Sequence, residues 1–189
     1  TIFSSDKTKI IVFNGEIYNF QELREDLEKD GDTFYTNSDT EVILHLYEKY
    51  GVDCVKYLNG MFAFAIWDET AKTLFIARDR IGKKPLLYSH QKDGSLVFGS
   101  EFQAVLKHPD VSREVDFDAI DDYLSYSCVP APKTAFTQNR KLKRGHRMHW
   151  KNGEIKTKRY WLPDFTAKID ISQQEAEEET LRILSEATK

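Results

Sequence analysis

The segment FNGEIYNF, residues 13–20, places an amide side chain, a glycine and a carboxylate in succession after the apolar run KIIV. The Asn14 side-chain amide and the Gly15 backbone N–H could point at one position, because glycine has no Cβ to keep a ligand away from the backbone. Two such donors stabilise the negative charge that develops on a reacting oxygen. Glu16 and the more distant Asp39 could then hold a substrate ammonium group. The pattern therefore indicates a site that polarises a carbonyl and binds an amine.

Each of these residues also has a purely structural interpretation. Asn-Gly is the favoured dipeptide of a type I′ turn, although only three residues separate it from a helix start at Asn19, which is short for a hairpin arm. Asp39 could stabilise the positive end of a helix, and Glu16 could be a solvated carboxylate. From the local pattern alone, a turn and an oxyanion site are equally good interpretations of Asn14-Gly15.

Strand-like and helix-like segments alternate in the part of the chain that must position these residues. The β-branched run 9–13 predicts a buried strand. Asn19 and Glu22 have the spacing of a reciprocal capping box, which predicts a helix that ends at Gly31. SDTE at 38–41 has the same spacing and predicts a second helix. The candidate site would therefore lie where the first strand ends.

Hairpins dominate the middle of the chain. Their strands are predicted at 60–68 with 73–79, at 86–90 with 95–100, and at 146–161 around Asn152-Gly153. The unbroken hydrophobicity of FAFAI in the first pair indicates a strand buried on both faces. Helices are expected at 101–107, at 117–126, and after Ser172, which forms a capping-box pattern with Glu175. Sequential hairpins with flanking helices favour a layered α+β sandwich over a doubly wound parallel sheet.

The composition is that of a globular protein with no feature of nucleic-acid or membrane binding. At 189 residues, the chain suits one domain with the start of a second. A net charge of −4 gives no electrostatic reason to expect a nucleic-acid partner. No run approaches the ~18 apolar residues of a membrane span, and no signal peptide is visible. Two cysteines without a CxxC motif, Cys54 and Cys128, suggest a reducing compartment, so we expect a cytoplasmic protein.

Six segments occur in the order expected of one protein family. They are VFNGEIYNFQELREDLEKDG, TNSDTEVILHLYEKYG, LNGMFAFAIWDE, LFIARDRIGKKPLLY, SEFQAVLKHPDV and VPAPKTAF. Together they resemble the glutaminase domain of the glutamine-hydrolysing asparagine synthetases, which are class II, N-terminal-nucleophile glutamine amidotransferases. The resemblance covers residues 8–165, and the ordered set is far more specific than any single motif.

The resemblance implies a fold, a substrate and roles for the candidate residues. The family fold is a four-layer αββα sandwich of two mainly antiparallel sheets. The domain hydrolyses the side-chain amide of glutamine through a Cys thioester and releases ammonia. By resemblance, Asn14 and Gly15 form the oxyanion hole, whereas Glu16 and Asp39 hold the α-amino group of glutamine. The resemblance thus favours the site over the turn, with the strand ending at residue 13 to present it.

The family's nucleophile has no counterpart in these residues. In the family it is a Cys whose own α-amino group is the base, and an α-amine with a pKa of about 7.7–8.0 suits proton transfer near neutrality. That Cys, and an Arg-containing loop that clamps the substrate carboxylate, lie several strands upstream of the NGE motif. We therefore expect an N-terminal part of the domain to be missing here and residues 1–189 alone to be inactive. Thr1 stands too close to Asn14 to replace the Cys, and Cys54 and Cys128 are expected to be structural.

The resemblance also predicts domain boundaries and partners. Residues 1–165 are expected to be the amidotransferase domain, and 166–189 a linker and first helix leading to an absent synthetase domain. The SGG-D-S pattern that would bind ATP phosphates does not occur, so ATP and Mg are expected only in that absent domain, with no cofactor and no metal in this one. Glutamine and the synthetase domain are the expected partners, and a homodimer is compatible with the resemblance. The alternative is a non-catalytic relative that binds glutamine or serves as a scaffold.

Two further groups of charged residues favour structural roles. Arg78-Asp79-Arg80 with Gly82 closes a strand and is expected to be an ion-paired turn. Residues 140–159 carry nine Lys or Arg, which could suggest a phosphate or nucleic-acid surface, but their spread over a hairpin favours a solvated face. His146 and His149 would face opposite sides of a strand, which argues against a metal site.

Overall fold

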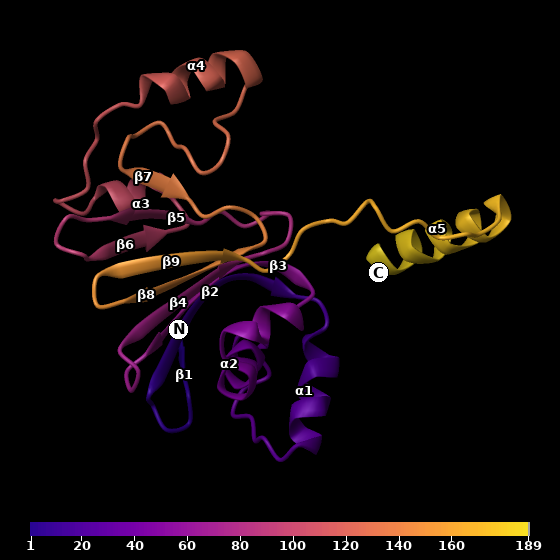
Figure 1. The fold of residues 1–189 in the computed structure, drawn as a ribbon. Coiled ribbons are helices and arrows are strands. Elements are labelled where there is room, and N and C mark those ends of the chain that lie inside the picture. Colours follow the sequence, from indigo (N-terminus) through magenta and orange to yellow (C-terminus); the bar gives the residue numbers. More distant parts are fainter. Residues whose placement is uncertain (189) are drawn as a thin grey trace.

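A six-stranded antiparallel sheet forms the centre of the computed structural model, which describes residues 1–188. Its strand order is β1 (Ile2–Phe3), β2 (Lys9–Ile17), β3 (Gly60–Asp68), β4 (Thr73–Arg78), β8 (His146–Lys151) and β9 (Glu154–Arg159). A three-stranded antiparallel sheet lies on one face of it (Figure 1). The order of this smaller sheet is β6 (Leu96–Gly99), β5 (Leu87–His90) and β7 (Asn139–Lys141).

Helices cover the outer face of each sheet (Figure 1). Those on the large sheet are α1 (Phe20–Lys29), α2 (Asp39–Tyr50) and the 3-10 helix η1 (Gly51–Lys56). Those beyond the small sheet are α3 (Phe102–Leu106) and α4 (Phe117–Tyr126). The last helix, α5 (Gln173–Ala187), extends away from these layers. The predicted four-layer αββα sandwich is therefore confirmed.

β3 joins two cores because its side chains alternate between the faces of the sheet. Phe62, Phe64 and Ile66 are buried in the core that the large sheet shares with α2. Ala63 and Ala65 are buried in the core between the two sheets, where their small side chains let the second sheet approach closely. The prediction of a strand buried on both faces is confirmed.

β2 runs straight through the Asn14-Gly15-Glu16 segment to Ile17, so the prediction that the strand ends at residue 13 is wrong. The segment pairs in register with residues 61–63 of β3, which also excludes the type I′ turn. Glycine is needed within the strand because the backbones approach closely here. A Cβ on Gly15 would lie only 2.1 Å from the carbonyl oxygen of Met61.

Only one of the three predicted capping boxes forms. Ser172 and Glu175 make the reciprocal hydrogen bonds at the start of α5. Asn19 makes no side-chain cap for α1, because its amide binds the loop before β3 instead. The Asn19 side chain donates to the carbonyl of Tyr57 at 3.0 Å and accepts from the N–H of Asn59 at 2.9 Å. A long-range contact thus replaces the local cap.

At the start of α2, Glu41 holds the preceding loop rather than completing a box with Ser38. Glu41 is 3% exposed and accepts hydrogen bonds from the backbone N–H groups of Tyr35 and Thr36. Burial alone would raise the pKa of the Glu41 carboxyl, but the hydrogen bonds from Thr36 and Tyr35 lower it below its ordinary value of 4.5. Because the folded-state pKa is depressed, the stabilisation is fully present above the unfolded-state pKa. It is lost as the pH falls through the folded-state pKa.

We expect Glu41→Gln to lower the free energy of unfolding at neutral pH by about 1–3 kcal/mol, because one amide oxygen replaces a buried carboxylate that accepts from two backbone N–H groups. The difference from the wild type should shrink below about pH 4, where the wild-type carboxylate also becomes protonated. Urea unfolding at neutral and acidic pH measures both effects. Glu25→Gln, an exposed glutamate of α1, is the matched control. Equal stability of the two variants at neutral pH would contradict the role of Glu41.

Candidate active site

The Gly15 N–H points to an open edge of β2. β1 pairs with β2 only at Ile10 and Ile11, so within residues 1–188 the far end of this edge has no partner strand. On the other side, the Tyr18 N–H donates to the Asn59 carbonyl near β3. The Ile17 N–H instead donates outward, to Asp39 Oδ2 at 3.0 Å. Since successive N–H groups of a strand alternate between its two edges, the Gly15 N–H points outward as well.

The register between β2 and β3 indicates the same outward orientation of the Gly15 N–H. Gly15 faces Phe62. The Phe62 N–H donates to Asp79 Oδ2 at 3.3 Å, and the Phe62 carbonyl accepts from the Asp79 N–H at 2.8 Å. Both backbone groups of Phe62 are thus engaged on the β4 side, which makes Gly15 and Phe62 a pair without mutual hydrogen bonds. The Gly15 N–H is therefore available to a ligand at the strand edge.

The Asn14 side chain faces the space between the two sheets. Its Nδ2 donates to Ser100 Oγ at 3.1 Å, and Ser100 follows β6 in the smaller sheet. An amide nitrogen carries two N–H groups, so one remains after this bond. Asn14 and Ser100 are the polar side chains of a largely apolar hollow of about 240 Å³. Its other lining residues are Val12, Phe13, Ala63, Phe64, Ala65, Leu86, Phe98 and Gly99.

Asp39 is tied directly to the end of β2. It is the first residue of α2, and one of its oxygens accepts from the Ile17 N–H. The other oxygen lies 3.4 Å from the hydroxyl oxygens of Ser38 and Thr40, at weak hydrogen-bond distance. The carboxylate therefore lies at the positive end of a helix, as the structural interpretation expected. The same contact brings it next to the strand that carries Asn14.

Glu16 is exposed, and its side chain makes no hydrogen bond or ion pair within residues 1–188. It lies two residues from Asn14 on the same face of β2. The four residues predicted from the sequence thus come together around the end of one strand and the start of α2. Ser100, which holds the Asn14 amide, was not predicted. Its sequence context, GSE before a short helix, resembles an ordinary loop.

The prediction of an ion-paired turn at Arg78-Asp79-Arg80 is wrong, because Asp79 forms no ion pair with either arginine. Asp79 is fully buried, and its two oxygens accept from backbone N–H groups rather than from an arginine. The donors are Phe62, Ile81, Gly82, Lys83 and Lys84. Asp79 therefore organises the loop after β4 and fixes it to β3 next to Gly15. The sequence could not distinguish these backbone hydrogen bonds from an ion pair, because an aspartate between two arginines is compatible with both arrangements.

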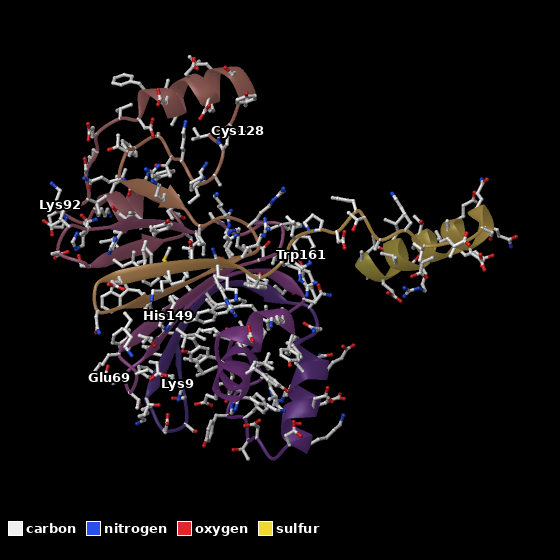
Figure 2. All side chains as sticks on the ribbon, viewed as in Figure 1. Lys9, Glu69, Lys92, Cys128, His149 and Trp161 are labelled. Carbon is white, nitrogen blue, oxygen red and sulfur yellow. The ribbon has the colours of Figure 1, made fainter. Side chains whose placement is uncertain are left out.

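Neither cysteine lies in the candidate site. Cys54 is fully buried in the core beside α2, where burial raises the pKa of its thiol to about 12, so the reactive thiolate is suppressed. Cys128 is exposed and follows α4 in the outer layer beyond the small sheet, as Figure 2 shows. In residues 1–188 there is no group of three His, Cys, Asp or Glu side chains placed to hold a metal ion. The described helices include none long and apolar enough to cross a membrane.

Two solved structures have a fold similar to that of this chain. Glutamine phosphoribosylpyrophosphate amidotransferase from B. subtilis, solved with ADP and GMP, matches with a TM-score of 0.60 over 86% of this chain and 31% of its own, at 23% identity. A structure described as the allosteric regulatory enzyme of purine biosynthesis matches with a TM-score of 0.61 at 24% identity, over the same shares. At this identity the likeness shows the fold alone.

Sequence comparison is more specific. Asparagine synthetase [glutamine-hydrolyzing] 3 of Bacillus subtilis is 40% identical over 82% of this chain and 25% of its own length. Asparagine synthetase [glutamine-hydrolyzing] 1 of the same organism is 41% identical over 85% of this chain and 25% of its own. A putative asparagine synthetase [glutamine-hydrolyzing] 2 of Methanocaldococcus jannaschii is 36% identical over 95% of this chain and 35% of its own. The chain thus spans about a quarter to a third of these relatives. These relatives carry names of glutamine-hydrolysing asparagine synthetases, and since residues 1–161 match the family described as "Glutamine amidotransferase domain", the chain belongs to that family.

Proposed function

We propose that this chain is the ammonia-supplying domain of an asparagine synthetase-like protein. In this proposal it binds glutamine, hydrolyses the side-chain amide and passes ammonia to an ATP-dependent synthetase domain of the same protein. The observation that carries the proposal is the outward Gly15 N–H beside the Asn14 amide, with two carboxylates at the same strand end. An oxyanion donor pair next to an ammonium-binding pair suits an amino acid substrate that contains an amide.

The reaction that we assign to the site is acyl transfer. A cysteine thiol outside residues 1–189 attacks the amide carbon while its own α-amino group takes the thiol proton. The carbonyl oxygen becomes an oxyanion, and hydrogen bonds from the Asn14 amide and the Gly15 N–H stabilise it. Collapse of the intermediate transfers the proton to the leaving nitrogen, releases ammonia and leaves a thioester. Water then hydrolyses the thioester to glutamate and the free thiol, with the amine again as base.

Glu16 and Asp39 would hold the α-ammonium group of glutamine. Hydrogen bonds between an ammonium and a carboxylate are charge-assisted and roughly twice as strong as neutral ones. Asp39 uses one oxygen to accept from Ile17, which fixes its orientation before substrate arrives. Glu16 has no partner in the part of the chain described here, so its oxygens are free to accept.

The remaining assignments concern the whole protein. We assign residues 1–165 to the amidotransferase domain and 166–189 to the linker and first helix before the synthetase domain. ATP and Mg would act only in that domain, with aspartate as the default acceptor of ammonia. The proposed compartment is the cytoplasm.

We expect Asp39→Asn in the full-length protein to raise the KM for glutamine by about 10–100-fold, equivalent to the ~1.5–3 kcal/mol of a hydrogen bond to a charged group. The asparagine oxygen can still accept from Ile17, so the fold and kcat should change much less. Glutamate formation from glutamine measures both constants. Asp118→Asn is the matched control, because Asp118 is an exposed carboxylate in the first turn of α4.

The two functional interpretations give different results in this assay. A wild-type full-length protein that forms glutamate and ammonia, together with a raised KM in Asp39→Asn only, supports the glutaminase. A wild-type protein that binds glutamine in calorimetry without hydrolysing it would indicate the non-catalytic relative. An unchanged KM in Asp39→Asn would remove Asp39 from the substrate site.

A further inference from the structure

A second hollow lies on the large sheet where the chain leaves the sandwich. Its volume is about 380 Å³, and it shares no lining residue with the hollow beside Asn14. Its walls are the loop after β4, the loop before β8, the end of β9 and residues 161–163, with Ala131 from another loop. Figure 2 shows Trp161 at the point where the chain turns away from the layers towards α5.

The lining of this hollow is strongly basic. It contains no acidic side chain, and its permanent cations are Arg78, Arg80, Lys143, Arg144 and Arg159. None of these five makes an ion pair with a carboxylate of residues 1–188. The whole chain carries a net charge of −4, so acidic partners are abundant elsewhere. Like charges gathered around one hollow repel each other unless an anion lies among them.

Arg78 is a partly buried cation of this hollow that has no ion-pair partner in the described residues. Its guanidinium is partly buried and donates to three carbonyl oxygens, those of Gly82, Lys84 and Leu142. Burial lowers the pKa of this guanidinium, which reflects the cost of holding its charge away from water. An arginine has five N–H groups, so two have no acceptor within residues 1–188. Buried charges are normally paired, but Arg78 makes no ion pair in the described residues: the neighbouring Asp79 carboxylate acts on it only at longer range, and its hydrogen-bond acceptors are neutral.

Backbone hydrogen bonds join the walls of the hollow to one another. The Gly145 N–H donates to the Asp79 carbonyl, and its own carbonyl accepts from Tyr160 and Trp161. A Cβ on Gly145 would lie 2.6 Å from the Trp161 carbonyl oxygen, so the two segments are in close contact. His146 Nδ1 donates to the Arg144 carbonyl at 2.8 Å, which holds that loop. A pre-formed site loses little conformational entropy when it binds a ligand.

We propose that this hollow is a binding site for a small multivalent anion that carries phosphate or carboxylate groups. Arginine forks match the oxygen pairs of both groups, and four arginines line the hollow. Ile81, Trp161, Leu162 and Pro163 add an apolar wall that suits an organic part of the ligand. Three of the cations belong to the basic run 140–159, for which the sequence favoured a solvated face. The site is separate from the glutamine site and does not depend on the function proposed for it.

The test is calorimetric titration of the full-length protein with three probes: pyrophosphate, inorganic phosphate and citrate. We expect the double variant Lys143→Ala/Arg144→Ala to bind the preferred probe at least about tenfold more weakly than the wild type. The control Lys158→Ala/Lys168→Ala removes the same charge from exposed positions outside the hollow and should change binding by less than about twofold. Arg159→Gln, whose exposed side chain makes no hydrogen bond in the described residues, is a second variant in case the double variant unfolds.

The probes separate the two chemical sources. Binding of the phosphates without citrate assigns a phosphate ligand, and binding of citrate as well assigns any multivalent oxyanion. Either result, with selective loss in the hollow variants, supports the site. Failure of all three probes to bind the full-length protein would overturn the proposed site. An equal loss of probe affinity in the control variant would also overturn it, because the loss would then reflect only the lower positive charge of the protein.

Discussion

Asn14→Ala in the full-length protein should reduce kcat for glutamine hydrolysis by about 10²–10³-fold, a loss of ~2.7–4 kcal/mol of transition-state stabilisation. In the proposed mechanism the amide donates most strongly once the oxygen has become negatively charged, so KM should change little. The fold should persist, because the Asn14 backbone keeps its place opposite Ala63 in the β2–β3 ladder. The effect should therefore appear in the chemical step alone.

Steady-state kinetics of glutamate formation separate kcat from KM for this variant. Ser100→Ala removes the acceptor that holds the amide, at 3.1 Å from Asn14 Nδ2, and should lower kcat by a smaller factor. Gln21→Ala removes an exposed amide from α1 and is the control for general effects. Unchanged turnover in Asn14→Ala would show that the amide does not bind the oxyanion. An equal fall in Ser100→Ala would instead show that orientation of the amide is what matters.

Elements whose signal is local were predictable from the sequence. The paired strands β3 and β4, the hairpin of β5 and β6, and the helices α2 to α4 all lie close to their predicted ranges. Their periodicity reports directly which faces are buried. Short elements that depend on tertiary contacts were missed, namely β1, β7 and η1. The two residues of β1 and the three of β7 are too few to show a period, and the six of η1 make only about two turns of a 3-10 helix.

The errors at the candidate site have one physical cause. Asn14-Gly15 resembles a strand end because glycine usually interrupts local structure, but here the glycine permits a close approach to Met61. Asn19 and Glu41 resemble capping residues, but the loops at 57–59 and 35–36 compete for their side chains. In each case the partner lies outside the local element: Met61 and the 57–59 loop are distant in sequence, and the 35–36 loop precedes α2. The types of the candidate residues were therefore predictable, whereas the contacts that orient them, such as Ser100, were not.

The last prediction concerns Asp79, which holds the fold together beside the site. We expect Asp79→Ala to lower the free energy of unfolding by more than about 4 kcal/mol, since it removes the acceptor of five backbone N–H groups, one buried and four part-buried, at about 1–3 kcal/mol each. The wild-type carboxylate accepts from the N–H groups of Ile81, Gly82, Lys83 and Lys84 in the loop, and from Phe62. Asp79→Asn keeps one acceptor oxygen and should lose less.

Urea unfolding measures the loss, and hydrogen exchange should show that the loop N–H groups become unprotected. Asp93→Ala is the matched control, because Asp93 accepts from Ser95 in an exposed turn and its loss should cost about 1 kcal/mol or less. Phe62 is the residue opposite Gly15, so a loosened Asp79 loop should also disturb the strand edge that presents the Gly15 N–H. Glutaminase activity should therefore fall in Asp79→Ala even under conditions where the protein stays folded. A stable, fully active Asp79→Ala would mean that the position of Gly15 does not depend on this buried carboxylate.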